Sequence, residues 1–296
     1  MPWFETATPT IEAEASMDAI ARRAVVNAQP LGPGCEAWRL AADRTVVLQG
    51  ASSLLMQVAH PIIAAAVIDH STTTDLVGRL NRTIASIWRL IYGGPAAAGE
   101  SQRLFEMHKA MKGIDANGNR YHALHPEAYA WVLATLFDGL NRYYVMINSP
   151  ISESDRERLY QDWRQLAELL GLRPWHLPAD LAGFEVYYET MIAERLHTNR
   201  AFHTMFKALL LSYMSSSPAR YLPDSVWNKL RPPASSLVRL CAVGMLRPSA
   251  RELFELPWTQ QDQRRLHMLG TGIRTVNAAL PKKARHNKLA TTAFRS

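Results

Sequence analysis

Six polar side chains stand out because they are embedded in apolar, helix-forming sequence between Leu54 and Gly113. Their imidazole, guanidinium and hydroxyl groups can ligate iron, bind anions or hydrogen-bond a small ligand. Buried polar groups must be paired or bound to something. The segment therefore either forms a hydrogen-bonded cluster of polar side chains inside a helical core or lines a cofactor pocket. The six residues are His60, His70, Arg79, Arg82, Thr83 and His108.

His108 shares one face of a predicted helix with Leu104 and Met111, at helical spacing. A lone histidine on an apolar face is more often a hydrogen-bonded core residue than an iron or zinc ligand. The same position would suit a ligand that holds a metal from one side of a pocket. The spacing alone leaves both interpretations open.

His60 precedes Pro61 in the apolar run of residues 53–67. Proline removes one backbone donor and clashes with the preceding turn, so the helix should bend there and free some carbonyl groups. His60 is then either a core histidine bonded to a freed carbonyl or a base in a pocket.

Arg79, Arg82 and Thr83 belong to a helix predicted over residues 76–92. Thr83 flanks the apolar stripe of this helix, Arg79 lies one turn below Thr83, and Arg82 points roughly opposite the stripe. Two cations in such places usually lie on a solvated helix edge. The sharper hypothesis is that Arg79 pairs with a carboxylate in a cleft, because a half-buried guanidinium needs an anion.

Other metal patterns are incomplete. Glu194 and His197 form a Glu-x-x-His pattern of the kind used by di-iron bundles, which need the motif on two helices plus two more glutamates. The chain has one copy. His122 and His125 lack a third ligand at zinc spacing. There is also no glycine-rich phosphate loop and no nucleophile elbow.

Composition limits the class of protein. The 296 residues are 48% hydrophobic, which is enough for a large core, and the net charge of +7 is spread along the chain. A tight basic run occurs at residues 281–288, which we interpret as part of a solvated tail, so no nucleic-acid partner is expected. Cys35 and Cys241 form no disulfide framework and suit a reducing compartment. We expect no signal peptide, no transmembrane span and a cytoplasmic location, with peripheral membrane contact as a further option.

The remaining sequence predicts an all-α fold in one domain. Pro126 begins the clearest helical pattern, and Ser152 with Asp155 resembles a capping box for the next helix. We find no convincing alternating strand and no repeat. The predicted division is an N-terminal arm (1–29), a helical domain (30–280) and a basic tail (281–296). Helices are predicted at about 15–27, 36–49, 54–67, 76–92, 98–112, 126–149, 152–170, 180–197, 202–213, 235–246 and 259–279.

A series of short motifs, in this order, resembles the MpaB and latex-clearing-protein family, over roughly residues 30–285. The motifs are Leu31-Gly32-Pro33, Ala59-His60-Pro61, Asp69-His70-Ser71, Gly78-Arg79-x-x-Arg82-Thr83, Tyr92-Gly93, His108 with Gly113, Gly118-x-x-Tyr121-x-Ala123, Trp131-Val132-x-Ala134-Thr135-Leu136, Pro150-Ile151-Ser152, Leu170-Gly171-Leu172, Gly244-Met245-Leu246-Arg247-Pro248 and Leu256-Pro257-Trp258.

The resemblance implies a haem b oxygenase with a globin-like helical core and extra helices. It implies that His108 is the proximal iron ligand and that Arg79 and Thr83 belong to the distal Arg-x-x-Lys-Thr motif. Arg82 stands where latex-clearing proteins have lysine. A guanidinium is always protonated and has no lone pair to give, so Arg82 cannot ligate iron. Arg82 and His70 are further cofactor-binding candidates.

The resulting hypothesis is an oxygenase that uses haem b and O2 on a hydrophobic, unsaturated substrate. His60 or Thr83 would hydrogen-bond O2, and Arg79 would anchor a propionate or polarise bound oxygen. A shared fold does not carry a substrate, so polyisoprene cleavage is not implied. The alternatives are a haem protein without turnover, acting in electron transfer or gas sensing, a non-haem iron enzyme using Glu194 and His197, and a helical protein without cofactor.

Overall fold

A computed structural model describes residues 29–70, 76–210 and 223–294, and of residues 76–80 it describes the backbone alone. Within these ranges the chain is mostly helical, as the all-α prediction requires. The predicted arm at 1–29 lies almost wholly outside the described residues. The elements are α2 (Glu36–Leu40), η1 (Arg44–Gln49), α3 (Gly50–Val58), α4 (Pro61–His70), α5 (Leu76–Tyr92), η3 (Gly94–Ala96), α6 (Ala97–Lys109), β1 (Lys112–Ile114), β2 (Arg120–His122), α7 (Pro126–Met146), α8 (Glu153–Leu169), η4 (Pro174–His176), α9 (Leu181–Glu194), α10 (Arg200–Leu209), α11 (Asp224–Gly244), α12 (Pro248–Leu253), α13 (Gln260–Ala279), α14 (Lys282–Arg285) and α15 (Lys288–Ala293).

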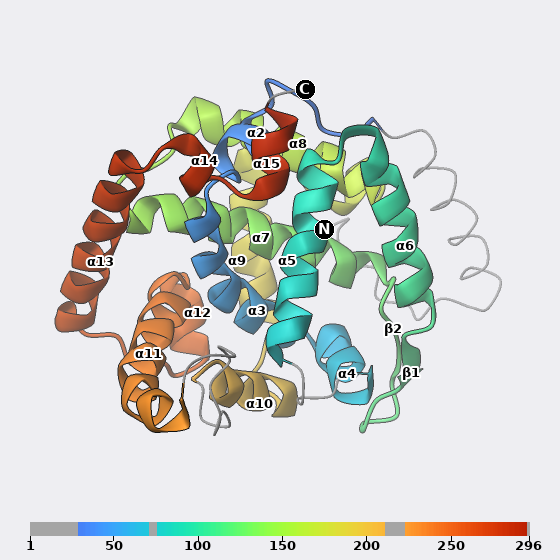
Figure 1. Cartoon of the computed structure of the whole chain (residues 1–296). Coiled ribbons are helices and arrows are strands. Elements are labelled where there is room, and N and C mark those ends of the chain that lie inside the picture. The colour runs from blue at the N-terminus through green and yellow to red at the C-terminus, as the bar shows by residue number, and fades with distance from the viewer. Residues whose placement is uncertain (1–28, 71–75, 211–222, 295–296) are drawn as a thin grey trace.

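Helix α7 passes through the middle of the molecule and packs against α3, η1, α8 and α13 (Figure 1). Pro126 is its first residue, where the fixed φ of proline suits a helix and the missing N–H is not needed. Trp131, Phe137 and Tyr143 are fully buried. Buried residues occur around most of the helix, as expected for one at the centre of a core.

Aromatic rings connect α7 to α8 and α9. The Phe137 ring meets the rings of Tyr160 and Phe184 edge to face, with centroids 5.1 and 4.8 Å apart. This geometry places the positive edge of one ring against the negative face of the next. The Tyr160 hydroxyl donates to the Pro178 carbonyl at 2.9 Å, so the polar end of the ring is satisfied inside the core. These contacts fix α7 against α8 and α9.

The bend predicted at Pro61 separates α3 from α4. The helical stretch from Arg44 to Val58 meets helix α4 at 101°. The carbonyls freed at the bend are used by the α9–α10 loop: Asn199 Nδ2 donates to the Val58 carbonyl at 2.9 Å, and the His197 N–H donates to the Ala59 carbonyl at 3.2 Å. The bend is therefore a fixed feature of the fold, with its open backbone groups paired.

Helices α5 and α6 form an antiparallel pair joined by the short η3 turn, and they lie side by side in Figure 1. Thr83 is nine residues before the end of α5, and His108 is eleven residues after the start of α6. At 1.5 Å per residue, they lie about 14 and about 17 Å along their helices from the turn. The pairing therefore brings the Arg79–Thr83 segment and His108 to the same end of the hairpin.

A small antiparallel sheet, β1 with β2, follows α6 and packs against α4. The sequence did not indicate these three-residue strands. Gly118 turns between them with φ of +83°, a conformation that glycine adopts without strain. A Cβ at Gly113 would collide with the Tyr121 ring, so glycine in β1 lets this tyrosine lie flat across its partner strand.

The C-terminal segment differs from the predicted solvated tail. It forms α14 and α15, and α15 packs against α5 (Figure 1). Asn287 is 2% exposed, and both its backbone N–H and its side-chain amide donate to the Ala42 carbonyl. Arg285 pairs with Asp43 at 2.8 Å. The basic side chains thus belong to a helical segment, which is held in place by contacts with Ala42 and Asp43 between α2 and η1.

Several helix boundaries also differ from the sequence-based expectation: the helix predicted over 36–49 is divided into α2 and η1, and α6 ends at Lys109 rather than at about residue 112. Helix α11 begins at Asp224 and contains Pro232 and Pro233, whereas the prolines had indicated a start at 235. Helix α9 ends at Glu194 rather than 197. In the described part of the chain, no single helix has the length and apolar character to cross a membrane. The bent pair of residues 44–58 and 61–70 meets those criteria only when taken together.

Candidate functional site

His108 lies in the last turn of α6 and is half-buried. Its Nδ1 atom is 3.1 Å from the hydroxyl of Tyr129 on α7, and the two rings meet at 86° with centroids 5.4 Å apart. Burial raises the pKa of Tyr129, so its phenol stays neutral. In one tautomer of His108 the proton is on Nδ1, and Nδ1–H donates a hydrogen bond to the Tyr129 oxygen. In that tautomer Nε2 carries the lone pair that can bind a metal. This pairing is typical of a histidine ligand whose ring is held by a second residue.

Thr83 is exposed and lines an apolar cavity of about 100 Å³ between η1, α3, α5 and α7. Three residues of the predicted apolar stripe of α5, Ile84, Ile87 and Ile91, also line this cavity. Thr83 therefore contributes a hydroxyl to an apolar wall. The lining residues are Ala41, Val46, Val47, Gln49, Gly50, Ser53, Leu54, Gln57, Thr83, Ile84, Ile87, Trp88, Ile91, Leu136, Leu140, Trp163 and Met205.

The other predicted cofactor-binding residues lie near the same end of the α5–α6 hairpin. Arg82 is exposed, in agreement with its predicted direction away from the apolar stripe. The backbone of Arg79 is in α5, but its side chain lies outside the described part of the structure. His70 ends α4 and is exposed. Its Nε2 atom is 3.1 Å from the Tyr121 hydroxyl, which also donates to the Asp69 carboxylate.

His60 is completely buried at the α3–α4 bend. Its Nε2 atom is 3.0 Å from one carboxylate oxygen of Glu127, and the other oxygen accepts from Arg195 at 2.6 Å. The Nδ1 atom of His60 is buried without a partner among the described residues. His60 is thus paired with a carboxylate rather than with a freed carbonyl. It lines neither this cavity nor the small one beside Arg247 described below.

Acid pH should weaken the fold through Glu127. Burial raises the pKa of its carboxyl, but the hydrogen bonds and charges of His60 and Arg195 outweigh burial and hold the pKa below its ordinary value of 4.5. A group with a depressed folded pKa contributes stability that is present above its unfolded pKa and lost as the pH falls through the folded pKa. We expect the difference in unfolding free energy between wild type and Glu127→Gln to be constant above about pH 5 and to shrink below about pH 4. Urea titrations of both proteins across pH 3–7 measure it, and a difference that grows toward acid would contradict the assignment.

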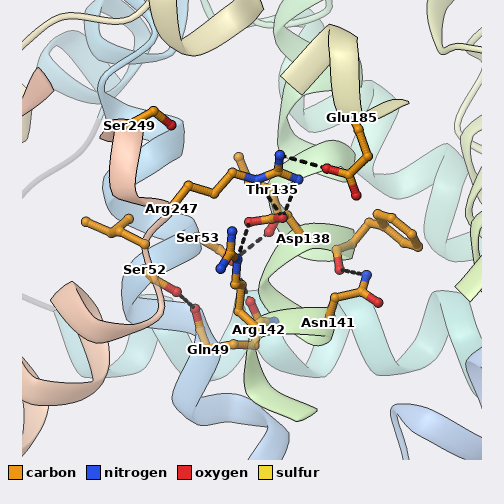
Figure 2. Close-up of polar contacts among 12 residues, drawn as sticks. Gln49, Ser52, Ser53, Thr135, Asp138, Asn141, Arg142, Glu185, Arg247 and Ser249 are labelled. Carbon is orange, nitrogen blue, oxygen red and sulfur yellow. Dashed lines mark hydrogen bonds and ion pairs between the residues drawn. The ribbon is translucent and has the colours of Figure 1, made fainter. Parts of the chain in front are cut away.

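A second buried network surrounds Arg247, which is 6% exposed (Figure 2). Its guanidinium donates to one oxygen of Asp138 on α7 from Nη2 at 2.7 Å and from Nε at 3.0 Å. It also pairs with Glu185 at 2.8 Å and Glu189 at 3.0 Å on α9. Burial lowers the pKa of Arg247, but Asp138 and Glu185 raise it by more. The guanidinium stacks 4.2 Å from the ring centre of Tyr188, so the network ties α7 and α9 to the start of α12.

A small cavity of about 10 Å³ lies beside this network. Ser53, Thr135 and Asp138 are among its lining residues. A space of this size is just large enough for one water molecule. Ser53 also lines the larger cavity, so polar side chains on α3 and α7 separate the two spaces.

The described residues offer no ligand set for the non-haem iron alternative. Glu194 is the last residue of α9, His197 lies in the loop after it, and both side chains are exposed. Nowhere in residues 29–70, 76–210 and 223–294 do three or more histidine, cysteine, aspartate or glutamate side chains gather so as to hold a metal ion. A protein-held O2-activating iron needs at least such a set, whereas haem needs one strong protein ligand.

Sequence comparison decides the family. The family described as "ER-bound oxygenase mpaB/B'/Rubber oxygenase, catalytic domain" matches residues 38–275, which is well over half of the chain. The chain belongs to this family. The resemblance seen in the motifs is thereby confirmed, and the mpaB/rubber oxygenase domain spans the elements from α2 to α13.

Two mycobacterial proteins resemble part of this chain in sequence. They are "Uncharacterized protein Mb2261" of Mycobacterium bovis and "Uncharacterized protein Rv2237" of Mycobacterium tuberculosis. Each is 23% identical to this chain over 181 residues, which are 60% of this chain and 65% of the relative. The chain therefore matches less than two thirds of each relative's length. None of the solved structures matches the sequence significantly.

The residues of this mpaB/rubber oxygenase domain fit a group that is bound through a single histidine. His108 has its ring held by Tyr129, and no set of three metal-binding side chains competes with it in the described ranges. Thr83 lies at the same end of the α5–α6 hairpin as His108. His108, Arg79, Arg82, Thr83 and His70 therefore keep their candidate roles.

Sequence reasoning missed the contacts that Glu127, Tyr129 and Arg247 make in the structure. Glu127 lies in the first turn of α7, where an acidic residue is common because it interacts favourably with the helix dipole. Its position in the sequence therefore gives no sign that it pairs with His60. Tyr129 was predicted as part of an apolar helix face, without its contact to His108. Arg247 appeared only as part of a motif, although the reversal of chain direction after α11 buries it against α7. Each of these contacts joins residues that are far apart in the sequence, so local sequence patterns do not predict them.

Proposed function

We propose that this mpaB/rubber oxygenase family member is a haem b-dependent oxygenase that acts with O2 on a hydrophobic substrate. Family membership supports oxygenase chemistry in general. The observation that carries haem dependence is the His108–Tyr129 pair, a half-buried imidazole whose Nδ1 is engaged by a neutral phenol. Such a pair orients Nε2 as a ligand and fixes the tautomer that can use it.

His108 would hold haem b through Nε2, and bound haem supplies the O2 chemistry that no side chain provides. Tyr129 keeps the Nδ1 proton in place and the ring in one orientation. Arg79 and Arg82 are always cationic and would bind the anionic propionates, whereas Arg82 cannot ligate iron. The exposed His70 would offer a further hydrogen bond there, fixed by Tyr121.

The Thr83 hydroxyl would hydrogen-bond a polar ligand against an apolar wall. The apolar side chains that α5 and α7 contribute to that wall suit a hydrophobic substrate. His60 is assigned no contact with the substrate, because it is fully buried against Glu127 and lines neither cavity. In this proposal its role is to fix the α3–α4 bend, from which the cavity wall begins.

The test is the visible spectrum of the purified protein with a pyridine haemochrome assay. We expect one haem b per chain and a Soret band that shifts when CO is added to the reduced protein, because the guanidinium of Arg82 cannot ligate iron and so would not compete with CO. Colourless protein that does not take up added haemin would overturn haem dependence. A haem spectrum that responds to neither CO nor O2 would instead support the non-catalytic haem protein.

A further inference from the structure

The cavity beside Thr83 is too small for a macrocycle. Its volume of about 100 Å³ is below the roughly 300–1,000 Å³ of ordinary cofactor and ligand pockets. Val47 and Thr83, both solvent-exposed, are part of its lining, so the cavity opens to the surface. No charged side chain is among the described residues that line it. It suits a few heavy atoms at one end of an aliphatic molecule.

The polar lining of this cavity comes mainly from one helical stripe. Gln49, Ser53 and Gln57 follow one another at intervals of four residues, so they share one face of η1 and α3. The Ser53 hydroxyl lies within hydrogen-bond distance of Gln49 Oε1 and of the Thr135 carbonyl. Gln57 Nε2 donates to the Thr135 hydroxyl at 2.9 Å. The stripe therefore has most of its hydrogen bonds made within the protein.

Gln49 is the member with an unused donor. In the amide orientation of this structure, its side-chain oxygen faces the Ser53 hydroxyl and its Nε2 makes no hydrogen bond to the described residues, although Gln49 is only 9% exposed. A Cβ at Gly139 of α7 would collide with Gln49 Oε1 and Ser53 Oγ. The close approach that Gly139 permits holds the acceptor end of the amide against α7. An amide N–H₂ in the wall of an otherwise apolar cavity can donate to a ligand that brings its own acceptor.

We propose that this cavity binds an aliphatic chain bearing a neutral oxygen acceptor, a ketone, aldehyde or hydroxyl group, which accepts a hydrogen bond from Gln49 Nε2. A carboxylate would lose its hydration without meeting a cation in the lining. A pure hydrocarbon would leave the Gln49 donor desolvated and unpaired. The identification of this ligand as the substrate rests on the proposed oxygenase function, whereas its binding does not.

The test is isothermal titration calorimetry of the full chain, in a sealed cell without O2, with three six-carbon probes. We expect 2-hexanone to bind about tenfold more tightly than 1-hexene, which is the usual size of one hydrogen bond, and also more tightly than hexanoate. In Gln49→Leu the preference for the ketone over the alkene should vanish. Gln57→Leu is the matched control, because it lines the same cavity while its amide nitrogen is already bonded to Thr135; it should keep the preference.

Gly139→Ala gives a second route to the same answer, because the added methyl group displaces the Gln49 amide without changing its chemistry. It should also abolish the ketone preference. The proposal is overturned if hexanoate binds as tightly as 2-hexanone, or if Gln49→Leu and Gly139→Ala, checked for native helicity, keep the preference. Haem content measured on the same samples separates the two proposals. Ketone binding to haem-free protein would support the cavity and reject the cofactor, and haem without ketone preference would do the reverse.

Discussion

Replacing His108 with alanine is expected to release haem or to change its ligation, with a loss or shift of the Soret band. His108 is half-buried at this end of the α5–α6 hairpin, and its Nδ1 lies 3.1 Å from the Tyr129 hydroxyl, which orients Nε2 as the ligand. Removal of the one strong protein ligand leaves haem held by apolar contact and propionate charges. Imidazole added to His108→Ala should enter the vacated space and restore much of the original spectrum. Absorption spectra and haem content, measured with and without imidazole, report the result.

Two further variants separate ligation from packing. Tyr129→Phe keeps the ring volume and removes the hydroxyl, so haem should be retained but bound roughly 10–100-fold more weakly, as for the loss of a group that orients a ligand. His60→Ala should lower stability through Glu127 and leave the spectrum of the iron unchanged. If His60→Ala releases haem while His108→Ala retains an unaltered spectrum, the assignment of His108 is wrong.

Local chemistry explains why much of the fold could be predicted. The start of α7 at Pro126 and the cap of α8, where Ser152 accepts from the Asp155 N–H, depend on residues within one turn of each other. The bend at Pro61 follows from the missing donor of proline. The helical structure of the C-terminal segment could not be predicted, because it depends on hydrogen bonds from Asn287 to the carbonyl of Ala42, which is far away in the sequence.

The candidate site was predictable only in part, for the same reason. Position 108 followed from the resemblance to the family, and helical spacing placed Thr83 beside an apolar face. The contact between His108 and Tyr129 brings the end of α6 to the start of α7, and the pairing of His60 with Glu127 joins the α3–α4 bend to α7. The polar stripe from Gln49 to Gln57 was overlooked because Gln49 precedes an apolar helix and had no visible partner.

Arg247→Met is expected to be among the most destabilising single substitutions in the described chain. The change leaves the Asp138 carboxylate, whose side chain is 9% exposed, without its two-nitrogen partner (Figure 2). Arg142, with Nε 3.8 Å from Asp138, is too distant to replace both hydrogen bonds. Breaking a buried pair by removing one partner costs about 3–5 kcal/mol, because an uncompensated charge stays buried. Urea denaturation followed by circular dichroism measures the change in unfolding free energy.

A second substitution decides whether charge or packing is responsible. In Asp138→Leu with Arg247→Met both charges are replaced by apolar groups, and most of the lost stability should return, because such replacements are often neutral or stabilising. Arg158→Ala is the surface control: this arginine side chain is 57% exposed beside Glu36 and Asp155, so its loss should cost about 0–1 kcal/mol. If Arg247→Met costs no more than Arg158→Ala, the network does not fix α7 to α9. If the double variant is as unstable as Arg247→Met, the effect comes from lost packing on Tyr188 rather than from the buried carboxylate.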